Sequence, residues 1–247
     1  MRRYLLNLLN IIPLLFVVAT VQAGNLSQEQ DGITLNNTRV IYPGDARNGI
    51  TYTLTNNTPR PYLLQSRILP YDDSTVENKA EEEKTVPFVV LPPLTRFEPD
   101  TALTLRIRLI QKTLPQDRES VFLLVLNAIP SQEENSEQTR LIMSTQNNLK
   151  LFYRPAGLPA ISETARTELP VFRHNGNTLT VKNPSPFYIT FSSLSVGNTN
   201  IDLHNTRMVA PFSELSWPLP ASVSGTLRWQ LITDDGSSSE TVIRSIE

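Results

Sequence analysis

Short runs of alternating apolar and polar residues follow one another along most of the chain. The run Gly49–Thr55 alternates cleanly, and the run 103–109 places Leu and Ile side chains on one face and Thr and Arg side chains on the other. Ser120–Ile129 is almost wholly apolar, which is typical of a strand buried on both faces. Two residues is the period of a β-strand, so the pattern predicts a chain built of strands.

Turn-forming sequences separate the expected strands of the first half. Pro43-Gly44 and Pro92-Pro93 are two of them, and Pro residues prevent continued strand pairing. Short strands between regular turn signals predict an antiparallel β-sandwich. The expected strands are 33–35, 39–41, 49–55, 62–69, 87–91, 103–109, 120–129 and 141–153.

A second set of strands follows an interruption in the pattern. Arg154–Pro159 contains a Pro-X-Gly-X-Pro segment, which is typical of a stiff linker. No stretch of three helical turns with an apolar face is found. We therefore expect two β-domains, residues 24–153 and 160–247, joined by a linker at 154–159. The later strands are expected at 171–173, 178–182, 188–194, 208–210, 214–217, 227–233 and 241–246.

The first 23 residues have the pattern of an export signal. Met1-Arg2-Arg3 is basic, residues 4–20 are strongly apolar, and Val21-Gln22-Ala23 offers a small-residue cleavage site. This order predicts a secretory signal peptide cleaved after Ala23. The alternative is a membrane anchor, but the apolar run is at the lower limit for a spanning helix and no second one follows. We therefore expect an exported mature chain that does not insert into a membrane.

Composition and charge favour binding over catalysis. The chain has 22 Lys+Arg against 24 Asp+Glu, which argues against nucleic acid or anionic lipid as a main partner. It has no Cys, and His174 and His204 lie in polar surroundings without metal-ligand spacing. No nucleophile elbow or glycine-rich phosphate loop is present. The sequence therefore predicts a protein that is not an enzyme and needs no cofactor or metal.

Five segments, in order along the chain, resemble those of the periplasmic pilus-assembly chaperones, the PapD-like family. They are Thr38–Gly44 (TRVIYPG), Pro92–Pro99 (PPLTRFEP), Leu114–Phe122 (LPQDRESVF), Lys150–Pro155 (KLFYRP) and Asn183–Tyr188 (NPSPFY). The resemblance implies two immunoglobulin-like β-sandwiches arranged as an L or boomerang with an interdomain cleft. It also implies a periplasmic chaperone that binds, folds and caps pilus (fimbrial) subunits and delivers them to an outer-membrane usher.

In this family the chaperone lends a strand to a subunit that lacks one, and the resemblance assigns that donor strand to 141–149. Leu141, Met143 and Thr145 share one face and would enter the subunit groove. The family usually has a large aliphatic residue where this chain has Thr145, which indicates a subunit with a shallower or more polar pocket there. From alternation alone, Leu141 and Met143 could instead pack in their own core.

The resemblance also assigns charged residues to the cleft. Arg39 and Lys150 would anchor the C-terminal carboxylate of the subunit, whose acceptor sites suit two cations. Lys150 has the opposite parity to Leu141 and Met143, so a regular strand places them on opposite faces.

A second charged group is implied between the domains. Glu119, Arg154 and Asp234 match an interdomain salt-bridge network in the family, with Asp235 as the alternative to its neighbour.

The interval 131–140 is short and polar, which resembles the short-loop branch of the family, and the absence of Cys agrees with that branch.

Two questions stay open at this point. A secreted two-domain adhesin or carbohydrate-binding protein is the alternative function. Whether the free protein self-associates is also open.

Overall fold

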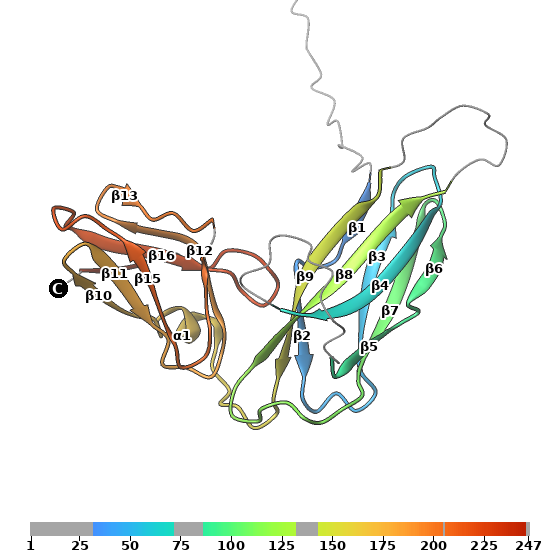
Figure 1. Cartoon of the computed structure of the whole chain (residues 1–247), viewed down its shortest axis with the longest axis horizontal. Helices are drawn as coiled ribbons and strands as arrows, with labels where there is room; N and C mark the ends of the chain where they lie inside the picture. The colour runs from blue at the N-terminus through green and yellow to red at the C-terminus, as the bar shows by residue number, and fades with distance from the viewer. Residues whose placement is uncertain (1–31, 72–85, 132–142, 205, 246–247) are drawn as a thin grey trace, which may run out of the picture. The chain divides into compact units, whose positions relative to one another are not determined.

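The structure is a computed structural model that describes residues 32–71, 86–131, 143–204 and 206–245. Nearly all regular structure in these residues is β-strand, as the alternation predicts, and one short helix is present (Figure 1). The signal peptide expected at 1–23, the polar interval 132–140 and Leu141 lie outside the described residues.

The first sandwich consists of two sheets. One is antiparallel throughout and has the order β1-β3-β7-β5. The other has the order β2-β9-β8-β4-β6, in which only the β2–β9 pair is parallel. The strands are β1 (Ile33–Leu35), β2 (Arg39–Pro43), β3 (Ile50–Asn56), β4 (Tyr62–Pro70), β5 (Phe88–Leu91), β6 (Leu94–Phe97), β7 (Thr101–Leu109), β8 (Ser120–Pro130) and β9 (Thr145–Arg154).

The inward faces of these two sheets form one hydrophobic core. Leu54 and Leu105 come from the first sheet, Leu124 and Leu151 from the second, and all four are almost completely buried. The Tyr42 hydroxyl lies at the edge of this core, where it accepts a hydrogen bond from Leu109 N–H at 3.1 Å and donates to Ala46 O at 3.2 Å. The alternation read from the sequence is therefore the alternation between core and outer face.

The second sandwich has its own core. One sheet has the order β10-β11-β15, and the other has the order β13-β12-β16-β17, with β14 also paired to β12. Phe191, Trp217 and Trp229 are buried between them. The strands are β10 (Val171–Asn175), β11 (Thr178–Lys182), β12 (Ile189–Val196), β13 (Thr199–Asn200), β14 (Met208–Val209), β15 (Glu214–Pro218), β16 (Thr226–Leu231) and β17 (Val242–Ser245).

The helix α1 (Glu163–Thr167) precedes the second sandwich and is bonded to it. Ser162 caps its start, because the Ser162 Oγ accepts a hydrogen bond from Ala165 N–H at 3.1 Å. The buried Trp229 donates its Nε1–H to Thr167 O at 2.8 Å. With five residues, α1 is too short to produce the three-turn apolar pattern sought in the sequence.

Apart from shifts of one or two residues at strand ends, three details differ from the expected strands. β6 and the two-residue β13 had no expected counterpart, and the last strand of the first sandwich begins at Thr145 instead of residue 141. Met143 and Ser144 are described but are not in a strand. Thr145 pairs with Ala128, so continued pairing would place Met143 opposite Pro130. Pro130 has no N–H to donate, which explains why the ladder stops there.

Candidate functional site

Strand β9 carries candidate residues on both of its faces. Leu149, Leu151 and Tyr153 point into the first core. Lys150 and Arg154 have the opposite parity, and so does the buried Phe152, whose ring lies 5.7 Å from that of Tyr188 in the second sandwich. The β8–β9 register runs from Thr145 to Tyr153 without a shift. No bulge therefore rotates Lys150 toward the face of Met143 and Thr145, and the two groups of predicted residues use opposite faces.

The two edges of β9 are paired over different lengths. The edge toward β8 is paired from Thr145 to Tyr153, whereas the edge toward β2 is paired only from Lys150 to Arg154. Within the described part of the chain, residues 145–149 have no strand partner on that second edge. Thr145 is exposed, and the Met143 side chain before it is 78 % exposed. The start of β9 thus presents an open edge beside exposed side chains.

Arg39 lies directly opposite Lys150 in the parallel register of β2 and β9. Its guanidinium donates to the second sandwich: Nη1 to Ile232 O at 2.5 Å and to Thr233 O at 3.2 Å, and Nη2 to Thr190 Oγ1 at 3.2 Å. The same group lies over the Phe152 ring, 4.4 Å from its centre. Burial lowers the pKa of Arg39 to about 10, although the nearby carboxylates of Asp234 and Glu119 oppose this shift.

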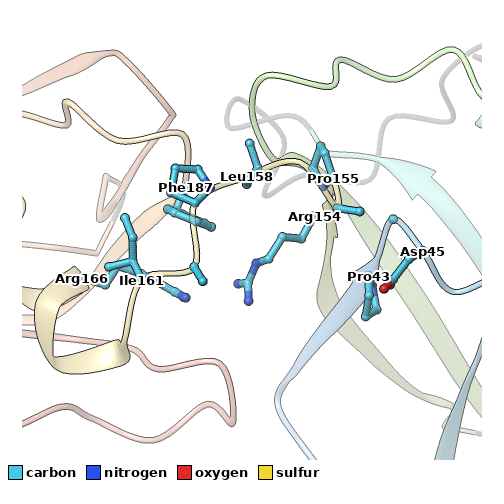
Figure 2. A pocket seen from close by; sticks show the side chains of 12 residues that line it. Pro43, Asp45, Arg154, Pro155, Leu158, Ile161, Arg166 and Phe187 are labelled. Carbon is cyan, nitrogen blue, oxygen red and sulfur yellow. The ribbon is translucent and has the colours of Figure 1, made fainter.

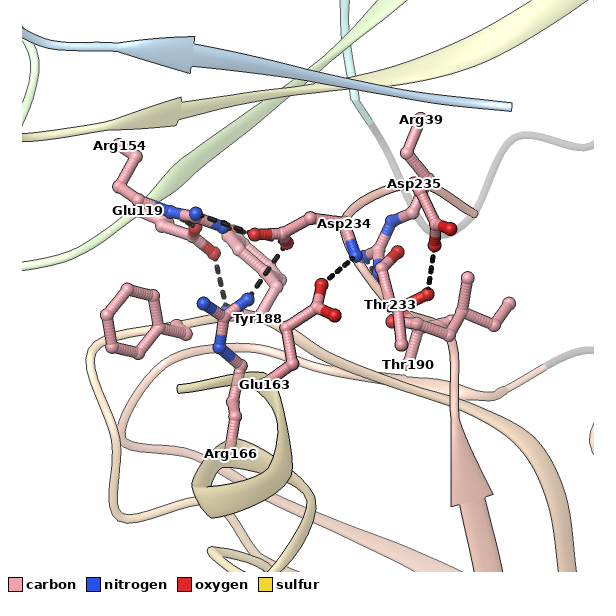
Figure 3. A network of polar contacts seen from close by, with 12 residues as sticks. Arg39, Glu119, Arg154, Glu163, Arg166, Tyr188, Thr190, Thr233, Asp234 and Asp235 are labelled. Atoms are coloured by element: carbon pink, nitrogen blue, oxygen red, sulfur yellow. Dashed lines mark hydrogen bonds and ion pairs between the residues drawn. The ribbon is translucent and has the colours of Figure 1, made fainter. Parts of the chain in front are cut away.

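Arg154 joins two acids that are far apart in the sequence (Figure 3). Its Nε donates to Glu119 Oε1 at 2.7 Å, and its Nη1 and Nη2 donate to the two carboxylate oxygens of Asp234 at 2.8 and 2.9 Å. The other Glu119 oxygen accepts Tyr188 N–H at 2.8 Å. The structure thus brings together three predicted residues, one from the second sandwich and two from the first. Bidentate pairing of this kind fixes orientation as well as distance.

The two acids of this network respond differently to burial. The Glu119 side chain is only 2 % exposed, and burial raises its pKa despite the opposing charge of Arg154. Burial also disfavours ionisation of Asp234, but the bonds and charges of Arg154 and Arg166 outweigh it and lower the Asp234 pKa. Asp234 is therefore the more firmly ionised of the two.

Asp235 belongs to its own loop instead of the network. Its Oδ1 accepts hydrogen bonds from Thr233 Oγ1 and from Ser237 N–H and Oγ. These bonds lower the pKa of Asp235 to about 2 and shape the loop of residues 232–238, here called the Asp234 loop. Gly236 in this loop has φ +89°, and a Cβ there would collide with the Thr38 side chain. The Asp234 loop therefore touches the first sandwich at the start of β2.

Two residues of the network escaped sequence reasoning. Arg166 Nη1 donates to Asp234 Oδ1 at 2.8 Å, and Glu163 Oε1 accepts Asp234 N–H at 3.0 Å. Both lie on α1, three residues apart, where a helix places them on one side. The only available signal was Ser162 before this polar segment, a residue that favours a helix start.

A pocket lies beside Arg154 at the linker (Figure 2). Its walls combine apolar side chains, among them Leu158, Ile161 and Phe187, with the guanidinium-bearing side chains of Arg154 and Arg166. Gly44 N–H donates to Arg154 O at 2.7 Å, which continues the β2–β9 pairing to the end of β9. The same arginines thus lie between the linker pocket and the acids of the network.

Comparison with known proteins identifies this arrangement. Residues 32–159 match the family described as pili and flagellar-assembly chaperone, PapD N-terminal domain, and residues 164–242 match pili assembly chaperone PapD, C-terminal domain. The chain belongs to the PapD-like family of pilus-assembly chaperones. This confirms the resemblance read from the five segments, and the family role is a non-enzymatic one.

Relatives of known name support the same assignment. The chain is 35 % identical over 236 residues to the probable fimbrial chaperone LpfB of Escherichia coli O157:H7, and the match covers 94 % of each chain. It is 32 % identical over 226 residues to the chaperone protein FimC of Escherichia coli K12, covering 91 % of this chain and 87 % of FimC. These relatives favour the fimbrial chaperone over the adhesin that the sequence left as an alternative.

Solved structures agree with the fold. The SafB chaperone in complex with the SafA pilin of Salmonella enterica aligns with a TM-score of 0.73 at 30 % identity, over 87 % of this chain and 96 % of that chain. The Escherichia coli chaperone DraB aligns with a TM-score of 0.71 at 32 % identity, over 87 % and 98 %. These matches confirm the all-β fold with immunoglobulin-like sandwiches.

The described residues contain neither a metal-binding cluster nor a membrane-spanning helix. No three His, Asp or Glu side chains gather in a way that could hold a metal ion. No described helix has the length and apolar character needed to cross a membrane.

Proposed function

We propose that this chaperone binds pilus subunits by adding the open edge of β9 to an incomplete subunit sandwich. The observation that carries the proposal is the one-sided pairing of residues 145–149, because an unpaired strand edge beside exposed side chains is what strand addition requires. Met143 and Thr145 would enter the subunit groove, together with Leu141, which lies outside the described residues. The neighbouring SafB structure, a chaperone in complex with a pilin, supports this type of partner.

Arg39 and Lys150 are proposed to hold the subunit's C-terminal carboxylate. They are paired residues on adjacent strands, so their side chains leave the sheet at the same level. Lys150 lies 5.1 Å from the Tyr71 ring centre, and Arg39 is committed to acceptors of the second sandwich. Arg39 both supports the carboxylate site and joins the sandwiches.

The remaining assignments follow from the same role. Residues 1–23 would direct export to the periplasm and be removed after Ala23. Residues 24–153 would form the subunit-binding domain, 154–159 the linker and 160–247 the second domain. The network of Glu119, Arg154 and Asp234 would fix the relation between the domains, and the loaded chaperone would pass its subunit to an outer-membrane usher.

Co-expression with a candidate subunit tests the proposal. We expect a stable one-to-one periplasmic complex that Lys150→Ala weakens by about tenfold or more, since a charge-assisted bond is worth about 1.5–3 kcal/mol. Lys182→Ala on β11 is the matched control and should leave affinity unchanged. Lys150 gives the cleaner test than Arg39, because removing Arg39 also removes bonds to the second sandwich.

Two results would overturn parts of this scheme. Normal binding by the Lys150→Ala variant would remove the anchor role from Lys150. Binding that persists after residues 145–149 are replaced by a sequence that cannot pair would show that the open edge of β9 is not the subunit site.

A further inference from the structure

The helix α1 contacts Asp234 through the side chains of Glu163 and Arg166. Asp234 Oδ1 accepts hydrogen bonds from both Arg154 Nη2, at 2.9 Å, and Arg166 Nη1, at 2.8 Å. Glu163 Oε1 accepts the backbone N–H of the same residue at 3.0 Å. Two side chains of one short helix thus hold both the carboxylate and the backbone of Asp234 (Figure 3).

These helix contacts lie wholly within the second sandwich. Arg166 and Glu163 are bonded to it through Thr167, whose carbonyl accepts the Trp229 indole N–H. Arg154, in contrast, reaches Asp234 from β9 of the first sandwich. The contacts from α1 therefore do not depend on docking of the two sandwiches, whereas the contact from Arg154 does.

Phe187 lies against both arginines that converge on Asp234. Its buried ring has the Arg166 guanidinium at 4.7 Å and the Arg154 guanidinium at 5.4 Å from its centre. A ring face attracts a cation, so one aromatic side chain supports both positive groups. The shared Asp234 oxygen and the shared ring together define where both guanidiniums lie.

We infer that Arg166 is a positioning residue that presets the Asp234 carboxylate for Arg154. With Arg166 and Glu163 in place, the Asp234 loop is ordered before the sandwiches meet, so docking does not have to order it. The inference deepens the proposed function, on which it rests, because the relation between the sandwiches decides whether Arg39, Lys150 and the edge of β9 reach the subunit together.

The absence of native Cys allows a direct test on the free chain. Ala102 on β7 and Ala221 after β15 are exposed, one in each sandwich, and Ala→Cys at both gives a pair of unique labelling sites. Spin labels at these sites report the distribution of distances between the sandwiches. We expect Arg166→Ala to broaden this distribution. Arg166→Lys, which keeps a cation for Asp234, should narrow it again.

Control variants separate this role from general destabilisation. Arg228→Ala removes an exposed arginine of β16 and should leave the distribution unchanged. Arg166→Gln keeps most of the side chain without its charge. It should also broaden the distance distribution, and it serves as the test if the Ala variant fails to fold. An unchanged distribution in both Arg166→Ala and Arg166→Gln would overturn the inference.

Subunit affinity then separates the inference from the function on which it rests. We expect Arg166→Ala to weaken subunit binding by about tenfold, equivalent to about 1.4 kcal/mol, with rescue by Lys. If wild type binds the subunit and the distance distribution of Arg166→Ala is unchanged, the positioning role is rejected and the proposed function stands. If Arg166→Ala broadens the distribution but the wild-type chain binds no subunit, the proposed function is rejected instead.

Discussion

The two halves of β9 have opposite environments although they form one continuous strand. Residues 150–154, here called the covered half, are paired with β2, and all of them except Arg154 are also paired with β8. Phe152 in this half contacts Tyr188 of the second sandwich. Residues 145–149 are paired on one edge only and begin beside an exposed methionine. Because both halves share the pairing with β8, their difference comes from what lies on the other side. The contrast indicates that one half stabilises the protein and the other is available to a partner.

The largest expected effect tests the covered half. Arg154→Ala leaves the buried Glu119 carboxylate with a single hydrogen-bond donor among the described residues, Tyr188 N–H. Breaking a buried pair by removing one partner costs about 3–5 kcal/mol, and we expect a loss of this size in the free energy of unfolding in urea.

Arg96→Ala is the matched control for this variant. It removes an exposed pair with Glu98 that has nearly the same length, 2.6 Å, and should cost less than about 1 kcal/mol. Equal losses for Arg154→Ala and Arg96→Ala would contradict the distinction between buried and exposed pairs.

A smaller effect is expected in the pH dependence of stability, through Asp234 and Glu119, the two acids bonded to Arg154. The folded pKa of Asp234 lies below its ordinary value, so its stabilisation is present above about pH 4 and is lost as the pH falls through the folded pKa. The raised pKa of Glu119 acts in the opposite direction. Its contribution to stability is fully present below the ordinary pKa of a glutamate and is lost as the pH rises through the higher pKa of the folded state.

Comparison with Asp234→Asn isolates the contribution of Asp234. The difference in unfolding free energy between wild type and this variant should be constant at neutral pH and shrink below about pH 4. Trp217 and Trp229 are the only tryptophans and both lie in the second core, so their fluorescence follows that sandwich. A difference that stays constant down to pH 2 would show that Asp234 is not stabilised in its ionised form.

The smallest effect on stability is expected at Met143, just before the half of β9 that is paired on one edge only (residues 145–149). Met143 is 78 % exposed, so Met143→Ala should change the free energy of unfolding by less than about 0.5 kcal/mol. Its effect should appear in subunit binding, where burial of a methionine side chain contributes about 1.5–3 kcal/mol. Calorimetric titration with a subunit measures this loss.

Ile243→Ala provides the comparison for Met143→Ala. Ile243 is an exposed apolar residue of β17, in the second sandwich, and its replacement should affect neither stability nor binding appreciably. A loss of stability in Met143→Ala that exceeds its loss of subunit affinity would show that Met143 contributes more to the fold of the free protein than to subunit binding.

Period-two alternation was sufficient to predict most of the fold. The run 103–109 and the apolar segment 120–129 became β7 and β8, in which alternate side chains face the first core. The expectation that 120–129 is buried on both faces holds only in part, because Val125 is buried on the other face of β8 whereas its neighbours on that face are half-buried. The start of β9 could not be predicted from alternation, because it depends on Pro130 in a different strand. Pairing across strands is set by tertiary contacts that a local pattern does not contain.

The charged residues divide in the same way. Motifs brought Glu119 and Arg154 to attention, and the structure places them in contact, but no local pattern distinguished Asp234 from Asp235. That choice is made by the loop, in which Asp235 bonds to Thr233 and Ser237 and leaves its neighbour to face Arg154. Arg166 was not predicted, because a five-residue helix carries little periodic signal.

The continuous pairing of β9 with β8 has a consequence for conformational entropy. Ordering one residue's backbone costs about 1–2 kcal/mol. For residues 145–149 that loss occurs when the first sandwich folds, since β8 already holds them extended. A subunit that pairs with this edge therefore meets a strand with little freedom left to lose, and the free energy of the new contacts goes into holding the subunit.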